Sequence, residues 1–189
     1  MDIDNIRKTC WEKAYHAYAT SYIFEQRANL YGRRLKFLTF LGIVVPLAIG
    51  TIYLSFGPSI PGWLLTIAGI LGLVQIIGSA LSLSFKWDDY FAYAKESITV
   101  NRQQSNEYRN LAQSSDTDNL NIRFQILEAS SQARDALDDQ QGVTDEERRM
   151  GHRATLRKFQ KQCVNCKQKP MSMDPSECPV CGNFKRRKL

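Results

Sequence analysis

The sequence predicts an all-α membrane protein, in which a two-transmembrane helical hairpin joins long cytoplasmic helices and a small cysteine-rich segment lies near the C-terminus. Three observations support this fold class. Residues 37–85 contain no charged side chain, although the 189-residue chain carries 25 Lys or Arg and 19 Asp or Glu. Helical periodicity extends on both sides of this run, and four of the five cysteines lie close together near the C-terminal end. We therefore divide the chain into residues 1–36, 37–85, 86–160 and 161–189.

The uncharged run is too long for one membrane span and about long enough for two, because a transmembrane helix needs roughly 20 apolar residues. Two prolines and two glycines interrupt it at residues 57–62, where a helix cannot continue. We therefore expect spans at about 37–56 and 63–85, with Trp63 and Trp87 at the membrane interfaces. A buried helical hairpin in a soluble protein is the alternative interpretation of the same run.

The charges beside the uncharged run predict its orientation. Arg33, Arg34 and Lys36 precede the first span and Lys86 follows the second, whereas the turn between the spans has no Lys or Arg. Positively charged residues beside membrane spans are enriched on the cytoplasmic side. We therefore expect two spans with both termini in the cytoplasm.

The second span carries a regular stripe of small and polar residues. Alternate steps of four and three positions place them along one helical face, which consists of Ala68, Gly72, Gln75, Ser79 and Ser82. In one interpretation the stripe packs against the first span or a neighbouring protomer, because small residues let helices approach and polar ones hydrogen-bond between them. In the other, several copies assemble and the stripe lines a water-filled path. Membrane lipid and a second copy of the chain are the expected partners in both.

The segments outside the uncharged run are predicted to be helical. Residues 2–35 lack proline and combine an apolar strip (Ile3, Ile6, Cys10, Ala14 and Ala17) with an aromatic face (Trp11, Tyr15, Tyr18 and Tyr22). The helix of the second span is expected to continue unbroken to about residue 113. After a polar break at residues 114–118, the next helix should use a heptad-like seam of Ile122, Ile126, Ala129, Ala133 and Ala136 or Leu137.

A third cytoplasmic helix has a defined start. Gly142 is expected to end the helix before it, and Thr144 and Glu147 have the spacing of a capping box. A basic helix should then run to about Gln160. We expect these cytoplasmic helices to form a bundle or coiled coil that supports oligomerisation.

The cysteines have the spacing C-x2-C-x11-C-x2-C, formed by Cys163, Cys166, Cys178 and Cys181. Each C-x2-C pair can place two thiolates on one cation, and two pairs complete a closed tetrahedral site, as in structural zinc sites. We predict a small zinc ribbon, with iron in a rubredoxin-like site as an alternative for the same ligands. Disulfides are disfavoured in a reducing cytoplasm. Because so short a segment cannot build a core, the metal should supply most of its folding energy.

The C-terminal region is strongly basic. Residues 148–189 contain twelve basic and two acidic side chains, whereas residues 86–147 contain six basic and thirteen acidic ones. The end of the chain, Lys185, Arg186, Arg187 and Lys188, forms a basic zone together with Arg153, Arg157, Lys158 and Lys161. This zone is a candidate contact for phosphate in nucleic acid or lipid headgroups, or for a protein partner. Neutralising a zinc tetrathiolate is its alternative role.

Motifs for catalysis are missing from the sequence. It contains no Gly-rich phosphate-binding loop, no H-E-x-x-H and no G-x-S-x-G, and its two histidines are His16 and His152. We therefore expect no enzymatic activity and no small-molecule substrate.

Two family resemblances follow from these features. The N-terminal helix, uncharged hairpin and long following helix, over about residues 1–140, resemble the SLATT superfamily, named for the SMODS- and SLOG-associating two-transmembrane effector domain. The cysteine spacing resembles a mobile-element group of bacterial proteins described by the same C-x2-C-x11-C-x2-C pattern, in which the four cysteines named above would be the ligands.

The resemblance to SLATT proteins implies a function. It implies an oligomeric effector in the bacterial inner membrane that assembles and permeabilises this membrane during antiviral or mobile-element conflict. The cysteine-rich tail is additional to the basic two-span plan, so the alternative is a membrane-anchored adaptor whose tail recruits nucleic acid or a protein.

Overall fold

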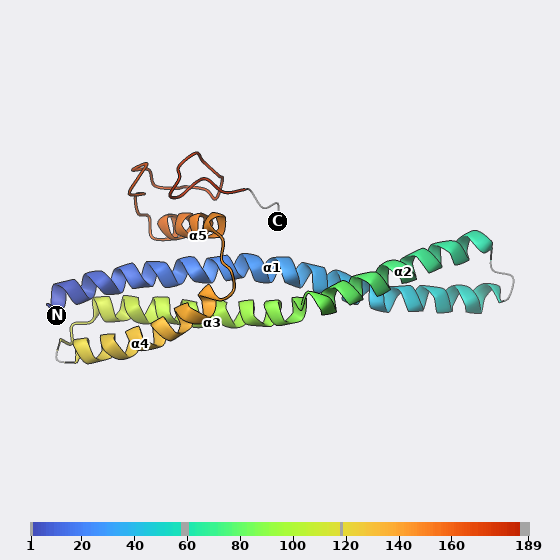
Figure 1. Cartoon of the computed structure of the whole chain (residues 1–189), viewed down its shortest axis with the longest axis horizontal. Helices are drawn as coiled ribbons and strands as arrows, with labels where there is room; N and C mark the ends of the chain where they lie inside the picture. The colour runs from blue at the N-terminus through green and yellow to red at the C-terminus, as the bar shows by residue number, and fades with distance from the viewer. Residues whose placement is uncertain (1, 58–60, 118, 186–189) are drawn as a thin grey trace. The chain divides into compact units, whose positions relative to one another are not determined.

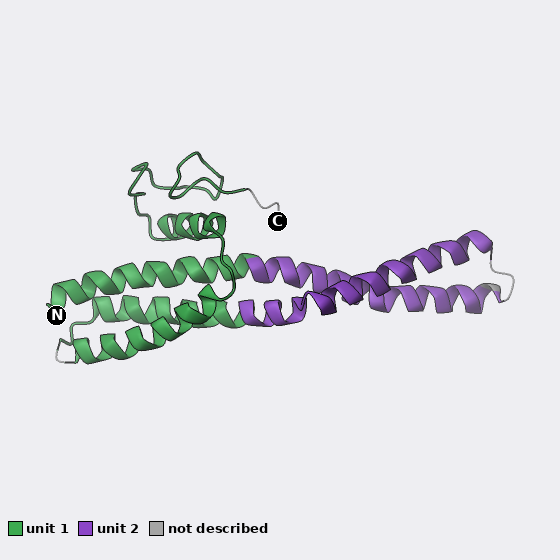
Figure 2. Ribbon diagram, in the orientation of Figure 1, with its two compact units in different colours: residues 1–26, 95–189 green, residues 27–94 purple. Residues whose placement is uncertain are grey.

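The computed structural model describes residues 2–57, 61–117 and 119–185, without the side chain of Phe56 (Figure 1). These ranges contain five helices and no β-strand: α1 (Ile3–Phe56), α2 (Gly62–Ser84), α3 (Trp87–Gln113), α4 (Leu120–Asp139) and α5 (Asp145–Lys158). They divide into two compact units (Figure 2). Unit 1 comprises residues 1–26 and 95–189, and unit 2 comprises residues 27–94. The all-helical prediction is therefore confirmed for the described residues.

Unit 2 contains the later part of α1, all of α2 and the beginning of α3, and its two long apolar segments lie in α1 and α2. Both are long and apolar enough to cross a membrane. The two helices approach closely at glycines, because a Cβ placed on Gly78 would lie 2.6 Å from Leu38 Cδ2, and one on Gly42 would lie 3.3 Å from Gln75 Nε2. The absence of a side chain at these positions allows this close approach.

A short break separates α2 from α3, so the expectation of one unbroken helix from residue 63 to residue 113 is wrong at this point. Lys86 has φ +49°, in the left-handed region, which an α-helix cannot contain. The amide of Lys86 donates to the Leu83 carbonyl, and the Lys86 carbonyl accepts from the amide of Tyr90 in α3. Because glycine and asparagine are the usual residues in this conformation, a lysine gave no sequence signal for the break.

Unit 1 has a small apolar core between α1, α3 and α4. Ile6, Cys10 and Ala14 of α1 pack there with Tyr108 and Leu111 of α3 and with Leu120 and Phe124 of α4. This confirms much of the apolar strip predicted on α1, although Ile3 is exposed. The core also confirms the assignment of Cys10 as a small packing residue.

The seam predicted on α4 is not buried within unit 1, and its role in contacts between copies of the chain stays a prediction. Ile122, Ile126 and Leu137 are 57%, 68% and 47% exposed, and the three alanines of the predicted seam are exposed as well. The buried residues of α4 are instead Leu120, Phe124, Ser131, Arg134 and Asp138. These buried residues are separated by steps of four, seven, three and four, which also place them on one helical face, so periodicity alone does not distinguish the two faces.

Polar partners from α3 explain why α4 buries its less apolar face. Asp138 accepts hydrogen bonds from Ser97 Oγ (2.9 Å) and Asn101 Nδ2 (2.7 Å), and Arg134 Nε lies 3.2 Å from its carboxylate. Arg134 also donates to Glu96 at 2.7 Å. Charged side chains are buried in proteins when they are paired and hydrogen-bonded, as they are here.

A second polar contact joins α4 to α1. The Glu128 carboxylate accepts from Lys13 Nζ at 2.7 Å and from the Tyr108 hydroxyl at 2.9 Å. These hydrogen bonds outweigh the partial burial of Glu128 and lower the pKa of its carboxyl group. Glu128 therefore stays ionised and holds α4 against the other two helices.

Helix α5 lies along α1 within unit 1 (Figure 1). Its predicted capping box is confirmed, because Thr144 accepts from the Glu147 amide and Glu147 accepts from the Thr144 amide. A Cβ on Gly151 would lie 2.7 Å from the Ala19 carbonyl of α1, so glycine permits this close packing. Tyr15 and Tyr18 of the predicted aromatic face contact the ring of Phe159, which follows α5.

Candidate metal centre

The cysteine-rich segment after α5 is built from two similar turns. In the first, the Lys167 amide donates to the Cys163 carbonyl at 3.0 Å. In the second, the amides of Gly182 and Asn183 both donate to the Cys178 carbonyl at 2.9 Å. No β-strand occurs in the described part of this segment, so the predicted ribbon has the form of two knuckle turns.

The two turns bring all four thiols together. The four sulfur atoms of Cys163, Cys166, Cys178 and Cys181 lie within 4.8 Å of one another. The Cys163 and Cys178 sulfurs are 3.9 Å apart, and the Cys166 and Cys181 sulfurs are 3.8 Å apart. A tetrahedron with Zn–S bonds of about 2.3 Å has sulfur–sulfur edges of about 3.8 Å, so the donor set fits a zinc ion.

The surroundings of the sulfurs favour a bound cation. The Cys181 amide and the Asn165 side chain donate hydrogen bonds to Cys178 and lower the pKa of its thiol to about 6. Burial, with contributions from the neighbouring thiols, raises the pKa of Cys181. Four thiolates at this separation repel one another, and a divalent cation removes that repulsion.

Two arginines of α5 hold the cysteine-rich segment in place. Arg149 Nε donates to the Asn183 carbonyl at 2.6 Å. Arg153 donates to the Ser172 carbonyl at 2.9 Å and to the Cys181 carbonyl at 3.3 Å. Leu156 packs against the buried cysteines. The sequence pattern did not reveal these contacts, because neither arginine is adjacent to a cysteine in the chain.

The described residues include only part of the predicted basic zone. Arg153 is committed to the backbone of the metal centre, whereas Arg157, Lys158 and Lys161 are exposed. Lys185 is exposed as well, and the remaining candidates, Arg186, Arg187 and Lys188, lie outside the described residues. A role of Lys185 and the three residues after it in phosphate or headgroup binding stays a prediction.

A comparison of the sequence with models of known protein families identifies the family of this chain. Residues 7–184 match the model of the family described as Mobilome CxxCx(11)CxxC protein. The chain belongs to this family. The match includes all four cysteines and reaches from α1 through α5, so the Mobilome CxxCx(11)CxxC family combines the apolar helices with the cysteine cluster in one unit of sequence.

Neither a curated protein nor a solved structure matches this chain. The cofactor assignment therefore rests on the family and on the cluster geometry, which together identify a structural zinc site. The site is closed, with four protein sulfurs as ligands, so zinc here organises the fold of residues 163–181.

The stripe predicted on α2 belongs to unit 2, whereas the metal centre belongs to unit 1. Ala68, Gly72 and Gln75 are half-buried, Ser82 is buried and Ser79 is exposed. Gly78, which the sequence pattern did not include, takes the position next to Leu38 of α1. Whether this face also lines a pore stays a prediction.

Replacing Gly182 with alanine is expected to disrupt the second knuckle. A Cβ at this position would overlap Ser176 Oγ and lie 2.6 Å from the Ser176 carbonyl oxygen, so the backbone must move. Overpacking of this kind costs about 1–3 kcal/mol. Zinc competition with a chromophoric chelator should show at least about tenfold weaker zinc binding.

The same substitution at exposed Gly69 on α2, where a Cβ meets no neighbour, is the control. Equal zinc affinity in the two variants would contradict the assigned role of Gly182.

Proposed function

We propose that the protein is an oligomeric, membrane-perturbing effector of bacterial antiviral or mobile-element conflict, anchored in the inner membrane by α2 and the apolar part of α1. In this proposal both termini are cytoplasmic and the zinc centre stays on the cytoplasmic side. The resemblance to SLATT proteins, which stays a prediction, and the family description as part of the mobilome suggest the biological setting.

The uncovered apolar surface of the two helices carries this proposal. Only 6% of the most apolar window of α1 and none of that of α2 is buried. The core helix of a soluble protein is mostly buried, so these helices differ from the soluble alternative. Large side chains such as Leu47, Ile70 and Ile76 are 57–69% exposed. Lipid would cover such surfaces at little cost, whereas water would not.

Side chains at one end of the hairpin support a membrane interface there. The Tyr31 and Tyr90 rings stack with centroids 5.6 Å apart, and the Arg34 guanidinium lies 5.0 Å from the Trp87 ring centroid. Tyrosine, tryptophan and arginine gather where the hydrocarbon core meets the headgroups. This cluster lies where the uncharged run begins and ends, so it agrees with the proposed spans.

A leakage experiment tests the proposed pore. The full chain is reconstituted into dye-filled liposomes, and release is compared with that from empty liposomes. Because polar groups stabilise water in a pore and apolar constrictions empty it, we expect Gln75→Leu to reduce release at least about fivefold. Ile76→Leu, at the lipid-facing neighbour, should leave release unchanged.

The interpretation depends on the assembly state of each variant. Size-exclusion chromatography must show that Gln75→Leu keeps the oligomer of the parent. Release equal to that of the parent in assembled Gln75→Leu would contradict the pore-lining role of the stripe. Absence of release from the parent itself, with the chain inserted, would instead favour an anchor. The adaptor alternative has less support from the structure, because Arg153 of the proposed basic zone is used inside the zinc centre.

A further inference from the structure

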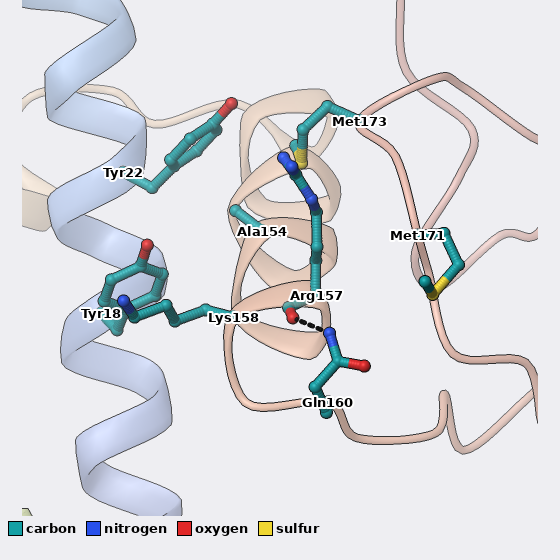
Figure 3. Close-up of a pocket in the computed structure, with 8 residues that line it drawn as sticks. All are labelled: Tyr18, Tyr22, Ala154, Arg157, Lys158, Gln160, Met171 and Met173. Atoms are coloured by element: carbon teal, nitrogen blue, oxygen red, sulfur yellow. Dashed lines mark hydrogen bonds between the residues drawn. The ribbon is translucent and has the colours of Figure 1, made fainter.

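A cavity of about 520 Å³ lies within unit 1, beside the zinc centre (Figure 3). Tyr18 and Tyr22 line it from α1, Arg157 and Lys158 from the end of α5, and Met171 and Met173 from the loop between the cysteine pairs. This volume is within the range of sites that hold small organic ligands.

Four side chains that line the cavity are hydrogen-bond donors, and a fifth polar residue, Gln160, donates to the Arg157 carbonyl at 2.7 Å. Within the described part of the chain, the hydroxyls of Tyr18 and Tyr22 make no hydrogen bond, and Arg157 and Lys158 form no ion pair. Burial raises the pKa of both phenols, so they remain protonated donors at neutral pH. Four donors therefore meet at one cavity, two of them positively charged.

The charged side chains that line the cavity, among the described residues, are all positive. No carboxylate is among the described residues that line it. Glu25, the nearby acid whose charge also raises the pKa of both tyrosines, is bound by Arg102 at 2.8 Å outside the cavity. An anionic group would therefore find two cations and two hydroxyl donors.

The remaining lining is apolar and adaptable. Two tyrosine rings project from α1 toward α5, and the two methionines lie on the loop beyond α5 (Figure 3). Met171 is 76% exposed, which leaves its side chain available to a bound molecule. Aromatic rings and thioethers pack well against flat apolar groups.

We propose that this cavity is a binding site for a small anion that carries a flat apolar group, such as an aryl phosphate or aryl carboxylate. Arg157 and Lys158 bind the anionic group, the two phenols donate to it, and Met171 and Met173 cover the flat group. The molecule is a ligand and no bond in it is changed.

The zinc centre controls the shape of this site. Met171 and Met173 belong to the loop that Cys166 and Cys178 close when zinc is bound, and Arg153 fixes the residue between them by donating to the Ser172 carbonyl at 2.9 Å. Removal of zinc therefore withdraws one wall of the cavity. The site therefore couples ligand binding to the metal centre, which Arg149 and Arg153 hold on α5.

Calorimetric titration of the zinc-loaded full chain in nanodiscs tests the proposal. The probe is 1-naphthyl phosphate. Inorganic phosphate, which has the anionic group but lacks the flat apolar group, is the comparison ligand. Empty nanodiscs give the blank. We expect saturable binding of 1-naphthyl phosphate and at least tenfold weaker binding of inorganic phosphate. Chelation of zinc should weaken binding of 1-naphthyl phosphate at least tenfold.

Two variants assign the binding to this cavity. Arg157→Gln, at an exposed position, should weaken binding at least tenfold, and Tyr22→Phe, which removes only a hydroxyl, about threefold or more. Arg123→Gln, at an exposed position of α4, is the matched control and should bind as the parent does. Zinc content and thermal unfolding establish that the variants are folded.

Any one of three results would overturn the proposal. The first is that 1-naphthyl phosphate shows no saturable binding below about 1 mM. The second is that Arg157→Gln and Arg123→Gln bind it with equal affinity, and the third is that inorganic phosphate binds as tightly as the aryl phosphate. Because binding is measured without leakage, its failure is distinct from failure of the pore proposal.

Discussion

Replacing Cys178 with serine is expected to remove zinc from the protein and to unfold the segment from Cys163 to Cys181. The four sulfurs lie within 4.8 Å of one another and provide a closed donor set, so loss of one leaves an incomplete site. The segment has no β-strand in its described part, and its own apolar core is little more than the cysteines, Leu156 and Val180. Zinc therefore supplies most of its folding energy.

Zinc content per chain, measured by inductively coupled plasma mass spectrometry, should fall from one to near zero in Cys178→Ser. Hydrogen exchange of residues 163–181 should rise to the rate of an unfolded peptide, while α2 keeps its protection. Cys10→Ala is the control, since Cys10 is buried in the apolar core of unit 1 and should leave zinc content unchanged. Full zinc occupancy in Cys178→Ser would show that Cys178 is not a ligand.

Replacing Asp138 with alanine is expected to release α4 from α1 and α3. Asp138 is 4% exposed and accepts from Ser97 and Asn101, and its carboxylate lies 3.2 Å from Arg134 Nε. Its loss leaves a buried guanidinium without this carboxylate, removes the acceptor of the Ser97 hydroxyl and removes one of the acceptors of Asn101 Nδ2. Removing one partner of a buried ion pair costs about 3–5 kcal/mol.

Hydrogen exchange of α4 amides measures this effect directly. A loss of about 3 kcal/mol corresponds to roughly hundredfold faster exchange. Asp139→Ala is the matched control at the next residue, because the Asp139–Arg148 pair is exposed on both sides and contributes about 0–1 kcal/mol. If α4 exchanges at the same rate in the two variants, the buried polar contact does not hold this helix.

The sequence predicted features that depend on local chemistry or on a single spacing. Thr144 and Glu147 cap α5 as expected, because both hydrogen bonds form within one helical turn. The four cysteines meet as expected, because each pair needs only a tight turn. Both apolar helices are present, because length and hydropathy follow directly from composition.

The sequence did not predict features that depend on which helices pack against one another. The break at Lys86 had no glycine to mark it, and the face of α4 was assigned to Ile122 and Ile126 rather than to Arg134 and Asp138. The face that packs within unit 1 could not be predicted because α3 supplies its polar partners, which no periodicity in α4 can show. The cavity beside the zinc centre was missed for the same reason, since its walls come from segments far apart in the chain.

The sequence by itself therefore determined that this chain has two apolar helices, a set of flanking helices and a four-cysteine zinc site. Only the tertiary structure decided which helix faces are buried, that Arg149 and Arg153 dock the zinc centre on α5, and that Tyr18 and Tyr22 share a cavity with Met171 and Met173. The physical reason is that local hydrogen bonds and hydrophobic length are encoded in neighbouring residues. Burial of a charged or polar side chain, in contrast, is stable only when a distant residue provides its partner.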